Sequence, residues 1–137
     1  MANHTKKVLI VEDGDDWRQL LALVIKSLGY EVFEAATGLE AIYQASAAHP
    51  DLILTDLGLP GMSGDEVMVQ LKMHPSTRDI PVVVQTAYAA GAVLNRAVEA
   101  GAAEILLKPV DLRTLCHVLH KYLSAKNQTA QPIATIC

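Results

Sequence analysis

Residues able to do chemistry follow four apolar runs of the sequence, each at the point where the run ends. Glu12 and Asp13 follow the first run, Asp56 closes the third, and Thr86 and Lys108 end the last two. Apolar runs of this kind are typical of strands buried on both faces, and such strands belong to parallel sheets. Because the carboxyl ends of parallel strands share one edge, we expect these side chains to converge there.

Three carboxylates within a few ångströms repel one another, which raises their pKa values unless a cation lies among them. A small set of oxygen ligands that leaves room for water and phosphate suits Mg²⁺ better than Ca²⁺, which takes about six to eight oxygens. The Lys108 ammonium and the Thr86 hydroxyl could then bind the charge of a phosphoryl group. Asp56, in the central strand, is the best candidate for its nucleophilic acceptor.

Five strand patterns alternate with five helical patterns along the chain. The strands are predicted over residues 7–11, 30–35, 52–56, 80–86 and 103–107, and a helical pattern follows each of them. This alternation predicts the α/β class, with a doubly wound parallel sheet and right-handed crossovers. Asp15 or Asp16 is expected to cap the first helix, and Gly29 to end it. Thr37 and Asp111 are expected to cap the second and the last helix.

The composition favours a single cytoplasmic domain. The 137 residues suit one domain, assigned to residues 1–123, and the polar residues 124–137 are expected to form a disordered C-terminal tail. The hydrophobic content is 51%, but no apolar run approaches the ~20 residues of a membrane span, and the N-terminus has no secretory signal pattern. A net charge of -4 without a basic run argues against direct nucleic-acid binding. The two cysteines and five histidines show no zinc-ligand spacing.

Taken together, these residues resemble the receiver domain of two-component response regulators, including chemotaxis regulators, from Lys6 to Leu123. The motifs that carry the resemblance are Val11-Glu12-Asp13, Asp56-Leu57-Gly58-Leu59-Pro60-Gly61-Met62-Ser63-Gly64, Thr86-Ala87 and Lys108-Pro109. Any one of them is weak evidence, whereas their joint order and spacing are highly specific. The resemblance implies a flavodoxin-like sheet with strand order 2-1-3-4-5 and five helices.

The resemblance also implies that Asp56 accepts a phosphoryl group from a sensor histidine kinase or a phosphotransfer protein. Thr86 and Lys108 would bind the phosphoryl oxygens, and the Lys108-Pro109 bond would be cis. The protein would then be a signalling phosphoacceptor, not an enzyme in the ordinary sense, because it catalyses only its own phosphorylation and dephosphorylation. Its output would go to an unknown downstream protein, and a weak homodimer is an alternative form of interaction.

The metal site implied by the resemblance holds Mg²⁺. Asp13, Asp56 and the backbone carbonyl of Gly58 would be ligands, and Glu12 would act through water. Glu12 stands where the family more often has Asp, so its reach is longer. Ile105 stands at the position where the family usually has an aromatic switch residue, Tyr or Phe. Isoleucine has no hydroxyl, so it cannot carry a polar group from the surface to the interior. Tyr88 is expected to shield the acyl phosphate from water, because Gly58 has no side chain.

Three other classes of protein could also have this architecture. A flavin mononucleotide site would need hydroxyls and amides after the first strand, where this chain has four acidic residues between positions 12 and 16. An aspartyl-phosphate phosphatase or mutase would need a second acid two residues after Asp56, where Gly58 stands. A phosphorylation-independent interaction module with the same architecture stays open as the alternative function, although the five site residues favour the phosphoacceptor.

Overall fold

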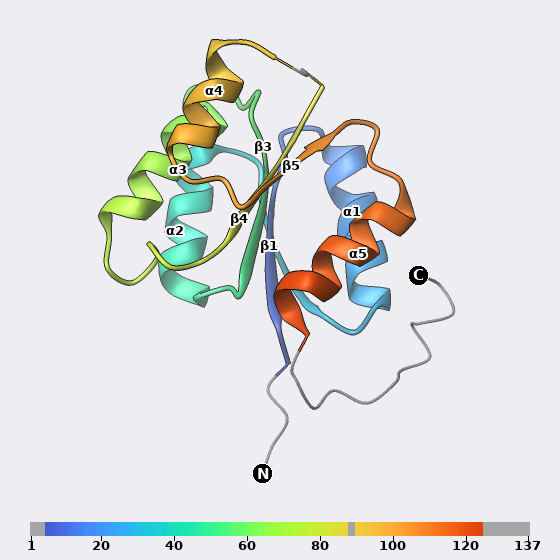
Figure 1. Cartoon of the computed structure of the whole chain (residues 1–137). Helices are drawn as coiled ribbons and strands as arrows, with labels where there is room; N and C mark the ends of the chain where they lie inside the picture. Colours follow the sequence, from blue (N-terminus) through green and yellow to red (C-terminus); the bar gives the residue numbers. More distant parts are fainter. Residues whose placement is uncertain (1–4, 88–89, 125–137) are drawn as a thin grey trace.

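Five parallel strands form one sheet at the centre of the protein (Figure 1). The computed structural model describes residues 5–87 and 90–124. The strand order is β2-β1-β3-β4-β5, which confirms the flavodoxin-like topology. The strands are β1 Lys7–Val11, β2 Glu31–Ala35, β3 Leu52–Asp56, β4 Val82–Thr86 and β5 Glu104–Leu107.

Helices cover both faces of this sheet. Figure 1 shows α1 and α5 on one side and α2, α3 and α4 on the other. The helices are α1 Asp15–Ser27, α2 Gly38–Ala48, α3 Gly64–Met73, α4 Ala92–Glu99 and α5 Leu112–Leu123. Within the described ranges, no helix is long and apolar enough to cross a membrane.

Two hydrophobic cores follow from the alternation of side chains along the strands. Ile10, Leu54 and Val83 pack with α1 and α5 in the first core. Leu9 and Ile53 point to the opposite face and pack in the second core with α2 and α3. Both cores are needed because the central strands are buried on both faces, which is the reason for their continuous apolar sequence.

The predicted helix ends are confirmed except at α1. The Thr37 side chain accepts a hydrogen bond from the Glu40 N–H at 3.2 Å, and the Asp111 side chain accepts one from the Thr114 N–H at 2.7 Å. Gly29 follows α1 with a φ of 100°, a left-handed conformation that favours glycine.

The prediction that Asp15 or Asp16 caps α1 is wrong. Gly14 is the N-cap residue, with no side-chain cap, and both aspartates lie in the first turn. There they interact favourably with the positive end of the helix dipole instead of capping it.

Candidate functional site

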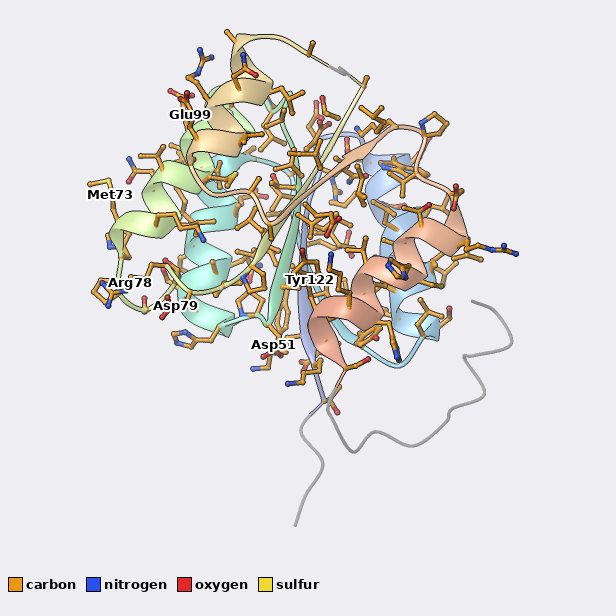
Figure 2. The ribbon with its side chains drawn as sticks, in the orientation of Figure 1. Asp51, Met73, Arg78, Asp79, Glu99 and Tyr122 are labelled. Atoms are coloured by element: carbon orange, nitrogen blue, oxygen red, sulfur yellow. The ribbon has the colours of Figure 1, made fainter. Side chains whose placement is uncertain are left out.

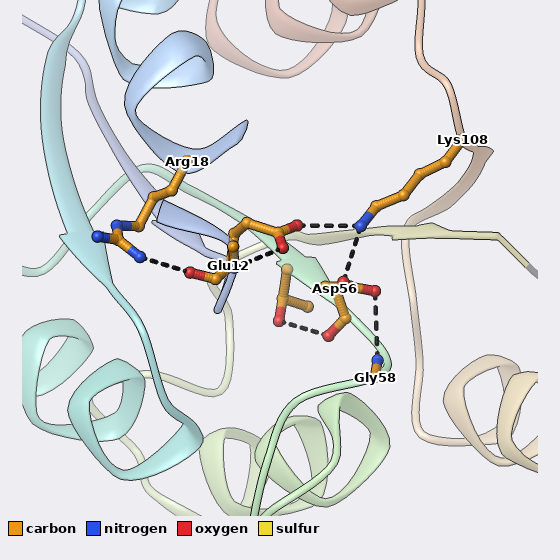
Figure 3. A network of polar contacts seen from close by, with 7 residues as sticks. Glu12, Arg18, Asp56, Gly58 and Lys108 are labelled. Atoms are coloured by element: carbon orange, nitrogen blue, oxygen red, sulfur yellow. Dashed lines mark hydrogen bonds and ion pairs between the residues drawn. The ribbon is translucent and has the colours of Figure 1, made fainter. Parts of the chain in front are cut away.

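Asp56 lies at the carboxyl end of β3, next to the apolar run that forms the middle of the sheet. Its side chain is 13% exposed. One carboxylate oxygen, Oδ2, accepts a hydrogen bond from the Lys108 ammonium at 2.8 Å, and the other, Oδ1, accepts one from the Gly58 N–H at 3.2 Å (Figure 3). The apolar strand therefore places an accessible carboxylate on the sheet edge, and its two neighbours set its orientation.

Two further carboxylates lie beside Asp56, as predicted from the strand ends. Glu12 and Asp13 follow β1, which is the direct neighbour of β3 in the sheet. Carboxylate oxygens of Glu12, Asp13 and Asp56 lie within 4.8 Å of one another. Glu12 is buried with a 5% exposed side chain, whereas Asp13 is exposed. The three acids thus form one cluster that is open to solvent on the Asp13 side.

Lys108 is the cation of this cluster. It follows β5, yet its ammonium contacts Asp56 on β3 and the Glu12 Oε1 atom at 3.0 Å, so its side chain extends past the end of β4 (Figure 3). The Lys108-Pro109 peptide bond is cis. Burial lowers the pKa of the ammonium, but the hydrogen bonds and charges of the two carboxylates outweigh it and raise the pKa above its ordinary value. Lys108 therefore stays charged at neutral pH.

The remaining predicted site residues lie around this cluster in different ways. Thr86 is buried at the end of β4, and its carbonyl oxygen accepts a hydrogen bond from the Lys108 N–H at 2.8 Å. Gly58 contributes its N–H to Asp56, as described above, and is exposed. Ile105 is half-buried against the second core. Tyr88, the predicted shield, lies outside the described residues.

Arg18 is a member of the network that the sequence did not predict. Its guanidinium donates a hydrogen bond to the Glu12 carbonyl oxygen at 2.9 Å (Figure 3). It also forms ion pairs with Asp15 and Glu34. The three-residue spacing from Asp15 could have indicated the first ion pair. No local signal could have indicated the contact with Glu12, which holds the loop after β1 against α1.

A further ion pair joins the start of α3 to α4. Asp65, in the first turn of α3, has a 6% exposed side chain and contacts the Arg96 guanidinium of α4 at 2.8 Å. The Ser63 hydroxyl also donates a hydrogen bond to Asp65. Burial opposes ionisation of Asp65, but these hydrogen bonds outweigh it and lower the pKa of the carboxyl. The pair therefore connects α4 to the segment that follows Asp56.

The chemistry of the cluster fits a hard divalent cation. Its side-chain donors are all carboxylate oxygens, and three carboxylates against one ammonium leave about two negative charges to be neutralised. Mg²⁺ prefers oxygen ligands of this kind and keeps part of its water shell, for which the exposed Asp13 side leaves room.

Comparison with known proteins shows which families and chains this protein is similar to. Residues 8–120 match the family model of the response regulator receiver domain. Sporulation initiation phosphotransferase F of Bacillus subtilis is 35% identical over 122 residues, which cover 89% of this chain and 97% of that protein. The polar-differentiation response regulator DivK of Brucella ovis is 38% identical over 119 residues, which cover 87% of this chain and 97% of that protein.

Solved structures of similar chains have the same fold. Chemotaxis protein CheY4 of Vibrio cholerae superposes with a TM-score of 0.82 at 31% identity, covering 88% of this chain and 100% of that one. The receiver domain of the sensor histidine kinase PA1611 from Pseudomonas aeruginosa gives a TM-score of 0.82 at 26% identity, covering 89% of this chain and 100% of that one. That structure has a magnesium ion coordinated in its active site cleft.

Proposed function

Because the chain belongs to the response regulator receiver domain family, we propose that it signals by accepting a phosphoryl group on Asp56 in a Mg²⁺-dependent reaction. The observation that carries this proposal is the surroundings of the Asp56 carboxylate. It lies 2.8 Å from the Lys108 ammonium and within 4.8 Å of two further carboxylates, at the end of a central strand. This arrangement suits a nucleophile that must later carry additional negative charge.

The carboxylates of Asp13 and Asp56 and the backbone carbonyl of Gly58 would hold Mg²⁺, with Glu12 acting through water. The all-oxygen donor set of the acidic cluster supports this assignment. When bound, the ion would neutralise the charge that gathers during phosphoryl transfer. The carboxylate of Glu12 already accepts hydrogen bonds from Lys108 and from the Gly14 N–H, each at 3.0 Å, so both of its oxygens are held in place.

In the transfer step, a carboxylate oxygen of Asp56 attacks the phosphorus atom of a phosphohistidine. The new phosphorus–oxygen bond forms while the phosphorus–nitrogen bond breaks, and the histidine of the donor protein leaves with the electron pair. The Lys108 ammonium would bind a phosphoryl oxygen, since it already lies beside Asp56. The Thr86 hydroxyl would bind another, because Thr86 ends the neighbouring strand.

The partners and setting follow from the same proposal. The donor would be a sensor histidine kinase or a phosphotransfer protein, and the phosphorylated form would control a downstream protein. The chain would act as a phosphoacceptor that catalyses only its own phosphorylation and dephosphorylation. We place it in the cytoplasm, with residues 1–123 as the receiver domain. The tail over residues 124–137 is predicted to be disordered, and residues 125–137 lie outside the described residues.

The test is to measure the mass of the intact protein after incubation with Mg²⁺ and a small phosphodonor such as acetyl phosphate. We expect one phosphoryl adduct, which Asp56→Asn abolishes and which excess chelator prevents. Asp79→Asn is the matched control, because this exposed carboxylate lies in the loop between α3 and β4, away from the site (Figure 2). A wild-type protein that takes up no phosphoryl group would favour the phosphorylation-independent interaction module instead.

A further inference from the structure

Gln85 is a buried amide in an otherwise apolar strand. β4 reads Val-Val-Val-Gln-Thr, and Gln85 is 0% exposed. Neither its side-chain oxygen nor its side-chain nitrogen has a hydrogen-bond partner within the part of the chain that the structure describes. Buried amides are nearly always hydrogen-bonded, and an apolar residue could fill the same space. We therefore expect the amide group to have a hydrogen-bond partner and a role that an apolar residue could not fill.

The strand register places Gln85 in the row of the phosphoacceptor. Asp56 of β3 is the direct partner of Gln85, two positions beyond the partners Leu54 and Val83. Leu54 and Val83 both belong to the core beneath α1 and α5. Since side chains alternate along a strand and paired residues share a face, Gln85 and Asp56 also point to this face.

Trp17 approaches the same face from α1. It packs against the first core, and its indole nitrogen is buried without a hydrogen-bond partner among the described residues. Trp17 lies in the first turn of α1, close in sequence to the acidic residues that follow β1. One unpartnered donor on α1 and one unpartnered amide beside Asp56 are thus directed into the same side of the sheet.

The chemistry of these groups is complementary. An amide accepts at its oxygen and donates at its nitrogen, whereas an indole N–H only donates and an ionised carboxylate only accepts. Each carboxylate oxygen of Asp56 receives one described hydrogen bond and can accept another. With a buried water between the groups, the amide of Gln85 can therefore accept on the Trp17 side and donate on the Asp56 side. A leucine or methionine could do neither.

We propose that Gln85 is a positioning residue that links Asp56 to Trp17 through hydrogen bonds made by buried water. The link orients the Asp56 carboxylate from the face of the sheet that α1 and α5 cover, and makes Trp17 respond to occupancy of the site. Its response to phosphorylation rests on the proposed function, whereas the contact between Gln85 and Trp17 does not. A buried water suits this position because it can donate and accept between the same polar groups.

The contact is tested without phosphorylation by NMR of the indole N–H, which gives a single resonance because the chain has one tryptophan. In Gln85→Met, which keeps the length and apolar stem, we expect this resonance to move upfield and to exchange with water about tenfold faster, as for the loss of one hydrogen bond. Gln19→Met, on the exposed side of the same helix, should leave it unchanged. An indole resonance that is identical in Gln85→Met and wild type would overturn the proposal.

The link to Asp56 is tested with Mg²⁺ and beryllofluoride, an acyl-phosphate mimic. We expect the indole resonance to shift on addition to wild type and to lose this response in Gln85→Met. A response that persists in full in the variant refutes the link. A wild-type indole resonance that does not shift while the mass assay shows an adduct also refutes the link. If both the adduct and the shift are absent, the result counts against the proposed function, and the first test alone decides on the link between Gln85 and Trp17.

A second variant keeps the inference testable if Gln85→Met folds poorly. Trp17→Phe retains a six-membered aromatic ring in the core and removes the N–H donor together with the five-membered ring of the indole. We expect it to slow adduct formation severalfold, because it breaks the same link at the Trp17 end. An unchanged rate of adduct formation in Trp17→Phe would contradict the proposal.

Discussion

Replacing Gly64 by alanine should separate α3 from the strand that carries Asp56. Gly64 begins α3, and its N–H donates a hydrogen bond to the Leu57 carbonyl oxygen at 2.9 Å. A Cβ atom at this position would overlap the carbonyl oxygen of Asp56 and lie 2.9 Å from the Leu57 Cα atom and 3.1 Å from the Asp56 carbonyl carbon. All three obstacles are backbone atoms, so no side chain can rotate away to relieve the overlap.

The size of the effect follows from two opposing terms. Overpacking of a well-packed region costs about 1–3 kcal/mol, and overlap with backbone places this case at the upper end. Alanine regains up to about 1 kcal/mol through its higher helix propensity. The free energy of unfolding should therefore fall by about 2 kcal/mol, which corresponds to a roughly 30-fold change in the unfolding equilibrium.

Urea unfolding followed by Trp17 fluorescence and by far-UV circular dichroism measures this change. Gly58→Ala is the matched control in the same loop, because a Cβ atom there would have no heavy atom within 4 Å. We expect its midpoint to stay close to that of wild type. If Gly64→Ala unfolds at the same urea concentration as wild type, the contact between α3 and the end of β3 does not constrain the site, and the reasoning fails.

Three further predictions concern other contacts. Asp65→Asn should lower the free energy of unfolding at pH 7 by about 1 kcal/mol. Because the folded pKa of Asp65 lies below its ordinary 3.8, the wild type keeps this advantage above pH 3.8 and loses it as the pH falls through the folded value. The stabilities of the two proteins should therefore converge in acid. Lys108→Met should abolish the phosphoryl adduct and tighten Mg²⁺ binding about tenfold by calorimetry, since the ammonium competes for the same carboxylates. Thr77→Val should cost about 1 kcal/mol in urea unfolding without changing Mg²⁺ affinity, because the buried hydroxyl donates to the Leu71 carbonyl oxygen at 2.7 Å, far from the site. The Asp65 contact would be contradicted if Asp65→Asn and the wild type had equal acid midpoints and equal stabilities at neutral pH. Weaker Mg²⁺ binding by Lys108→Met would contradict the Lys108 contact, and an unchanged urea midpoint for Thr77→Val would contradict the Thr77 contact.

Much of the fold could be predicted from the sequence because its signals are local. The apolar runs before Glu12 and Asp56 are strands, and the caps at Thr37 and Asp111 lie where their spacing to the following N–H groups places them. A strand period or a helix cap involves neighbours within about four residues, so a single stretch of sequence contains the whole signal. The prediction for the cap of α1 is wrong because Asp15 and Asp16 are equivalent local choices for a cap, and the helix already begins at Asp15, with Gly14 as its N-cap.

The same local signals showed which residues stand at the strand ends, and the parallel pairing of β1 and β3 brings the acidic residues together as predicted. Only the tertiary structure decided which partners they take. Lys108 contacts Asp56 and Glu12, which are 52 and 96 residues away in sequence, and Arg96 contacts Asp65 over 31 residues. The burial of Gln85 beside Asp56 is likewise a matter of strand register. These contacts depend on the order of the strands and on the distance over which a long side chain can cross them, and neither quantity is encoded within any one stretch of the chain.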